Sequence, residues 1–190
     1  MRNSLLTLAP VLLSATLSAQ GVFSNKTQAV LEKVIQDYPN HFYNIKGELI
    51  GQALQISRYK STLQLPGASS STITLYTASH NESSGWTCTV LESSNFSQAK
   101  KKFAEIYGQL SNSIITTSGQ KTFILSGQYE EPSEEKKFTH IVFSLLPGVG
   151  DMKKLKVELS LQEDGNGWKI VLTVQDRDPK DESQLAMTNN

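Results

Sequence analysis

The residues best suited to chemistry in this chain are three histidines and a single cysteine. His41, His80 and His140 lie far apart, and none has the spacing from another histidine that a metal site needs. Cys88 is the only cysteine, which excludes an intramolecular disulfide and a zinc site built on paired cysteines. We find no nucleophile elbow, no phosphate-cradling glycine loop and no zinc-protease helix motif. The sequence therefore predicts no catalytic residue, no metal site and no cofactor, and we expect a protein that is not an enzyme.

A strictly alternating segment supplies the first candidate binding surface. Polar Thr72, Thr74 and Tyr76 alternate with apolar Ile73 and Leu75, which is typical of a half-buried strand. The polar face of this strand is a reasonable recognition surface. The alternative is that this face is solvent-exposed without a binding role, or is covered by a helix.

Two polar loops supply further candidates, because loops on a rigid scaffold often carry binding residues. The first is the predicted turn at Asn81–Gly85 with His80 just before it, and the second is the charged segment 130–136. The candidate loop residues are His80, Glu82, Glu130, Glu131 and Glu134.

Helices and strands must position these candidates. Asn25 and Asn95 are good N-caps, each with a glutamine three residues later, and each precedes a helical apolar stripe. The segment 48–65 reads as strand, either one long bent strand or a hairpin turning near residues 57–58. Further strands are predicted at residues 72–77, 86–91, 121–129, 137–146, 154–162 and 168–175.

The order of these signals repeats along the chain. A helix cap, a Pro-Gly turn and a Gly-Trp strand start occur in both halves, in the same order. This order favours a tandem repeat, although such signals are common enough to coincide. We therefore expect an α+β fold, a tandem repeat of a helix followed by a three- to four-stranded antiparallel sheet, with units at 24–92 and 93–175. Each helix would cover its own sheet, and whether the copies share one sheet is left open.

The repeat also predicts the surroundings of the cysteine. It aligns Cys88 with Ile170, and Trp86 with Trp168. A position that takes isoleucine in one copy and cysteine in the other is typical of an apolar core, where a free cysteine packs as a small hydrophobe. We expect Cys88 to be buried and structural.

The N-terminus has the pattern of a secretory signal peptide. Arg2 precedes the apolar stretch 5–17, small residues follow at Ser18 and Ala19, and cleavage is expected before Gln20. Residues 1–19 are thus predicted to be removed, residues 176–190 read as a disordered polar tail, and no later run is long enough for a transmembrane helix. The chain has 18 basic and 18 acidic residues, so no global charge attracts nucleic acid. We expect a secreted or periplasmic protein.

Several short motifs resemble small exported bacterial proteins of uncharacterised families. They are Ile45-Lys46-Gly47, Leu65-Pro66-Gly67-Ala68, Trp86-Thr87-Cys88, and the helix containing Phe96 and Ala99. The resemblance covers mainly the first half and implies no activity. At the level of fold alone, the predicted tandem units are similar to beta-lactamase inhibitor proteins, although the paired disulfides of those inhibitors are missing here.

Three functions remain open at this point. The first is an exported, non-enzymatic binding or interaction module with an unknown partner, for which another exported protein is a candidate. The second is an inhibitor of a secreted hydrolase that uses its turn loops. The third, less favoured, is an enzyme whose site is assembled from dispersed residues.

Overall fold

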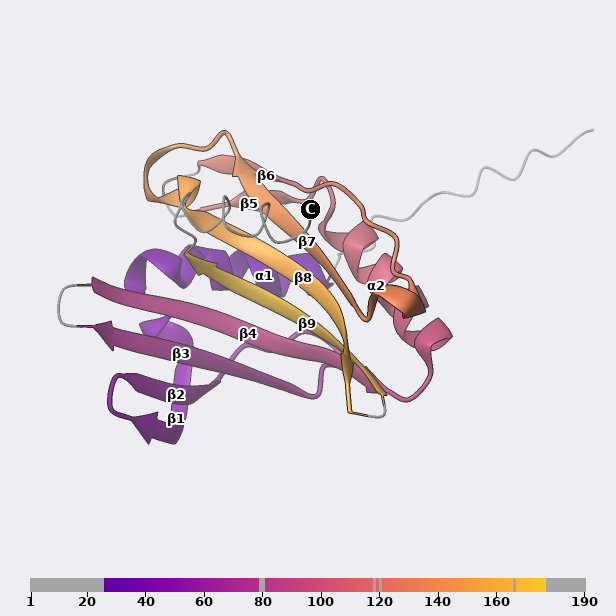
Figure 1. Cartoon of the computed structure of the whole chain (residues 1–190). Coiled ribbons are helices and arrows are strands. Elements are labelled where there is room, and N and C mark those ends of the chain that lie inside the picture. Colours follow the sequence, from indigo (N-terminus) through magenta and orange to yellow (C-terminus); the bar gives the residue numbers. More distant parts are fainter. Residues whose placement is uncertain (1–25, 79–80, 118, 120, 166, 177–190) are drawn as a thin grey trace, which may run out of the picture.

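One twisted antiparallel sheet dominates the computed structural model (Figure 1). The structure describes residues 26–78, 81–117, 119, 121–165 and 167–176. The helices and longer strands are α1 (Lys26–Asp37), β1 (Lys46–Ala53), β2 (Ile56–Ser61), β3 (Ser70–Ala78), β4 (Asn81–Ser93), α2 (Phe96–Leu110), β7 (Phe138–Leu146), β8 (Leu155–Asp164) and β9 (Gly167–Asp176). Two short strands, β5 (Ile114–Thr116) and β6 (Thr122–Ser126), complete the sheet. The predicted signal peptide, the cap at Asn25 and the tail beyond residue 176 lie outside the described residues.

The predicted tandem repeat is wrong. All nine strands of the described chain belong to one sheet in the order β1-β2-β3-β4-β9-β8-β7-β6-β5, and only two α-helices accompany them. The two predicted units meet at β4 and β9, which pair from Gly85↔Gln175 to Ser93↔Trp168. The signals that suggested repetition are a helix cap, a Pro-Gly turn and a Gly-Trp strand start. Each reports local geometry and does not specify separate sheets.

The surroundings of the two tryptophans also contradict the repeat, which aligned Trp86 with Trp168. Trp86 is fully buried in the middle of β4, and its Nε1–H donates to Ser61 Oγ at 3.0 Å. Trp168 lies at the start of β9 and packs against Phe96 of α2, with ring centroids 4.6 Å apart. The two rings therefore occupy unrelated surroundings.

A single hydrophobic core fills the space between the sheet and the helices. α2 packs on β4, β8 and β9, and α1 contacts α2, so both helices lie on one side of the sheet (Figure 1). Alternate strand residues point into this core, as period-two alternation requires. The largest fully buried side chains are Trp86, Phe42, Phe103, Phe143, Leu31, Ile35, Ile73, Leu110, Ile115, Leu125, Leu145 and Leu155.

The first helix was expected to cover the sheet of its own unit, but it also contacts β5, which belongs to the second predicted unit. Side chains of α1 bond to the outer backbone of this edge strand. Gln28 Nε2 donates to the Ile114 carbonyl at 2.8 Å, and Gln36 Nε2 donates to the Thr116 carbonyl at 2.7 Å. The Thr116 amide donates to Glu32 Oε1 at 2.8 Å. These bonds cap backbone groups that would otherwise offer an open sheet edge.

Several predicted turns and strands also need correction. Segment 48–65 does contain a hairpin, but it turns at Leu54-Gln55, between β1 and β2, rather than near residues 57–58. The predicted turn at Asn81–Gly85 is strand, because β4 begins at Asn81. β5 was not predicted, since three residues are too few to show a period of two.

Candidate functional site

The sheet side opposite the helices presents mostly polar side chains, and we call it the open face. It includes the predicted residues Thr72, Thr74 and Tyr76 on β3, whose neighbour Ile73 points into the core. Tyr76 is exposed, and Thr72 and Thr74 are half-buried. The other residues of the open face considered below are Ser83, Thr87, His140, Val142, Ser144, Lys156, Glu158, Lys169, Thr173 and Gln175, all from the strand positions that alternate with core residues.

A row of threonines crosses the middle of the open face. Thr72 of β3 pairs with Thr87 of β4, and Thr87 pairs with Thr173 of β9. Thr173 in turn pairs with Glu158 of β8. Because neighbouring strands lie about 4.8 Å apart, the row sets three hydroxyls and one carboxylate at regular intervals. We call these four residues the threonine row.

Glu158 is the acidic end of the threonine row, and two neighbours hold it in place. Its Oε2 lies 3.0 Å from His140 Nε2, and its Oε1 accepts from Gln175 Nε2 at 3.3 Å. The Glu158 side chain is only 12% exposed and that of His140 only 20%. Beside this cluster, Lys156 Nζ donates to Ser144 Oγ at 3.0 Å. The centre of the open face is thus an ordered polar network rather than a set of mobile surface side chains.

Sequence reasoning missed Glu158, His140 and Gln175 as site residues. The alternation along β8 and β9 is visible in the sequence. It places Glu158 and Gln175 on the face of the sheet opposite to that of their buried neighbours Leu159 and Val174. What the sequence did not show is that β8 lies between β7 and β9, the order that brings the three polar side chains together.

The predicted loop residues do not join the open face as a site. His80 and the side chain of Glu82 lie outside the described residues. Glu130 pairs with Lys136 at 2.7 Å, and Glu131 pairs with Lys100 of α2 at 2.7 Å. The hydrogen bond and charge of Lys100 lower the pKa of Glu131. Glu134 lies in a short 3₁₀ turn in the same loop.

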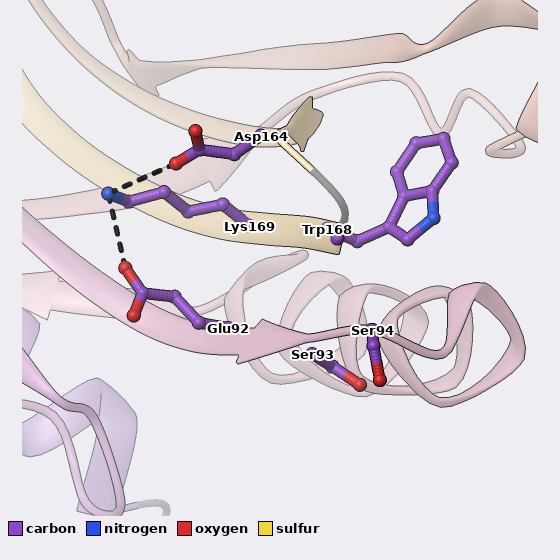
Figure 2. Close-up of a pocket in the computed structure, with 7 residues that line it drawn as sticks. Glu92, Ser93, Ser94, Asp164, Trp168 and Lys169 are labelled. Atoms are coloured by element: carbon purple, nitrogen blue, oxygen red, sulfur yellow. Dashed lines mark ion pairs between the residues drawn. The ribbon is translucent and has the colours of Figure 1, made fainter.

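A polar pocket of about 440 Å³ lies where β4, the β8–β9 hairpin and the start of α2 meet (Figure 2). Lys169 points between two carboxylates, 3.2 Å from Glu92 and 3.8 Å from Asp164. Ser93, Ser94 and Trp168 complete much of the wall. Because both carboxylates share one ammonium, the lysine is already neutralised, and the pocket presents no spare positive charge to an anionic ligand.

Cys88 is fully buried on the core face of β4, as predicted from its alignment with an isoleucine position. Burial raises the pKa of its thiol, and a backbone hydrogen bond from Leu65 offsets this in part. The reactive thiolate is therefore scarce near neutral pH.

We predict that Cys88 in the folded protein reacts with iodoacetamide at least about 100-fold more slowly than in denaturant, because the thiol is both inaccessible and protonated. Mass spectrometry of quenched time points measures the two rates. Equal rates would show that the thiol is accessible, and would contradict this placement.

Among the described residues, no three His, Cys, Asp or Glu side chains converge to hold a metal ion. Neither of the described α-helices has the length and apolar character needed to cross a membrane.

Comparison of the chain with protein-family models, with curated proteins and with solved structures found no match.

Proposed function

We propose that this chain is a non-enzymatic binding module that holds a polar partner, an exported protein in the simplest case, against its open face. The observation that carries the proposal is the threonine row, in which Thr72, Thr87 and Thr173 lead to Glu158. A hydroxyl both donates and accepts hydrogen bonds, so the row suits a partner surface of amides or hydroxyls. The Glu158 carboxylate at its end lies against His140 and accepts from Gln175, so it gives the row a fixed acidic end.

The order of the network supports this proposal. Side chains that are already held by neighbours lose little conformational entropy when a partner binds. Glu158 is held by His140 and Gln175, and Lys156 by Ser144. The threonines have short β-branched side chains with restricted rotamers. The open face is therefore arranged in advance for contact.

The charged loop 130–136 supports recognition of a partner less well than the open face. Glu130 and Glu131 are each paired with a lysine of the same chain. A partner that used these carboxylates would first have to displace those lysines. We therefore place the recognition surface on the open face rather than on the loop.

A photocrosslinking experiment tests the binding proposal. Tyr76 is replaced by benzoylphenylalanine, which keeps an aromatic ring at an exposed edge of the open face. The matched control carries the same group at Lys101, an exposed residue of α2 on the opposite side. We expect a discrete adduct with a protein other than this chain from position 76 in the exported fraction of the source cells, and none from position 101.

The substitution Thr87→Arg supplies the second arm, because it fills the middle of the threonine row with a large charged side chain. We expect it to reduce the adduct at position 76 by about tenfold, equivalent to a loss of about 1.4 kcal/mol, while circular dichroism shows an intact fold. The absence of any adduct from position 76, the same adduct from position 101, or no effect of Thr87→Arg would each contradict the proposal.

Export is a separate part of the proposal and has its own test. We propose that residues 1–19 direct the chain out of the cytoplasm and are then removed. Intact mass spectrometry of the native protein from the periplasm or medium is expected to find a chain that begins at Gln20. A full-length chain that stays in the cytoplasm would contradict export but would leave the open-face proposal standing.

A further inference from the structure

The two edge strands of the sheet, β5 and β1, differ in whether their outer backbone groups are hydrogen-bonded. At the β5 edge, three side chains of α1 bond to the outer backbone of Ile114 and Thr116. At the opposite edge, no described residue makes a hydrogen bond to the outer backbone of β1. An uncapped edge strand is a template for pairing with another strand.

The hydrogen-bond pattern identifies which part of β1 faces outward. The Thr77 amide donates to the Gln55 carbonyl, so the odd-numbered residues at this end of β2 bond toward β3. The even-numbered Ile56 and Arg58 then bond toward β1, where they pair with Ala53 and Gly51. Because backbone groups alternate in direction along a strand, the N–H and C=O of Gln52 point away from the sheet.

Apolar side chains surround this outward-facing residue. Leu54, at the tip of the hairpin, is fully exposed, and Ile50 is 47% exposed. An open apolar hollow of about 710 Å³ lies between the hairpin tip and Tyr76, and is lined by Ala53, Leu54, Gln55, Ile56 and Tyr76. Exposed large apolar side chains grouped at an open edge mark an interaction surface.

We propose that this edge pairs with a second copy of the same chain, antiparallel and about a two-fold axis through Gln52. In that register Gln52 exchanges both backbone hydrogen bonds with its counterpart. Ile50 of each copy lies opposite Leu54 of the other, beside the hollow. Such an isologous contact is self-complementary and closes after two copies.

Charge and register favour a second copy as the occupant. The charged residues of β1, Lys46 and Glu48, lie outside the paired segment, so no like charges face one another. Irregularities in the β1–β2 register lie between Lys46 and Gly51, whereas the run Gly51–Ala53 is regular. Bulges disfavour extended edge pairing, which confines the backbone pairing to residues 51–53, while Ile50 lies in the bulge and contributes only its side chain. Because the interface is small, the dimer is weak and concentration-dependent.

Disulfide trapping tests this register directly. The variant Gln52→Cys places two thiols opposite each other on the two-fold axis, within the Cα separation that a disulfide allows. Under mild oxidation we expect a covalent dimer to accumulate at least about tenfold faster than for Lys101→Cys on the exposed face of α2, since proximity replaces random collision. Equal rates for the two variants would overturn the proposal.

Sedimentation equilibrium of the otherwise unmodified chain supplies the second measurement. The weight-average mass is expected to rise from monomer toward dimer with concentration. Gln52→Pro removes the outward N–H without breaking the bonds to β2 and is expected to keep the chain monomeric, whereas Gln52→Ala dimerises as the native chain does. A native chain that stays monomeric throughout, or a Gln52→Pro variant that still dimerises, would refute the proposal. Neither result bears on the open-face function, because Gln52 is not part of the threonine row.

Discussion

Replacing Trp86 by alanine is expected to lower the free energy of unfolding by about 3–5 kcal/mol, the cost of emptying a large buried aromatic site. Trp86 is fully buried in β4, between Ile73 of β3 and Val174 of β9. It therefore contacts strands from both halves of the chain. Its indole N–H also donates to Ser61 Oγ, which would lose this partner. Urea unfolding followed by circular dichroism measures the change.

The form of the unfolding curve matters as much as its midpoint. Because one core spans the described sheet, the Trp86→Ala variant is expected to unfold in a single transition, shifted as a whole. Tyr76→Ala is the matched control, since this aromatic side chain is 44% exposed on the same sheet, and it should cost less than about 1 kcal/mol. Two separate transitions, with only one shifted, would show independent halves.

Replacing Asp37 by alanine is expected to cost about 3 kcal/mol, because several donors lose one buried acceptor. Asp37 ends α1 and is 6% exposed. Its carboxylate accepts from the Asn44 amide at 3.0 Å, the Ile45 amide at 3.2 Å and the Asn40 side chain at 3.1 Å. These bonds hold a tight turn in which Phe42 has a φ of 61° and is fully buried.

Asn40→Ala provides the control for this site. It removes one exposed donor to Asp37 and leaves both backbone bonds in place, so it should cost less than about 1 kcal/mol. Denaturant unfolding at pH 7 compares the two variants with the native chain. Similar small losses for both would show that the carboxylate does not organise the turn.

Features set by local chemistry were predicted well from the sequence. The second helix was expected after Asn95, and the structure confirms that its side chain accepts from the Gln98 amide at 3.0 Å. The burial of Cys88 was also predicted. The cap is a local interaction between residues three apart, whereas the burial of Cys88 was inferred from the alignment with Ile170, so that prediction is right although the repeat behind it is wrong.

Features set by contacts between distant segments were not predicted. Amphipathic spacing shows which face of α1 is buried. It does not show that Gln28, Glu32 and Gln36 bond to β5, which lies 80 or more residues further along the chain. Likewise, local signals could not show that β4 pairs with β9 rather than ending a separate sheet. Strand order is decided by the global packing of the core.

In the candidate site, too, some residues were predicted from local alternation and others required the strand order. Alternation in β3 predicted that Thr72, Thr74 and Tyr76 share one face, and the structure places them on the open face. The rest of the threonine row required strand order and register, because Thr87, Thr173 and Glu158 come from three different strands.

The central claim is that the two halves share one sheet whose open face carries the threonine row. A disulfide between cysteines introduced at Thr87 and Thr173 tests it most directly, since these residues are paired neighbours on β4 and β9. The control pair is Thr87→Cys with Val142→Cys. Val142 of β7 pairs with Glu158 at the end of the threonine row, so it lies three strands from Thr87, or about 14 Å. We predict that oxidation joins the first pair within one chain and leaves the second pair reduced. Failure of the first pair to form, or equal formation of both, would contradict a single sheet with this register.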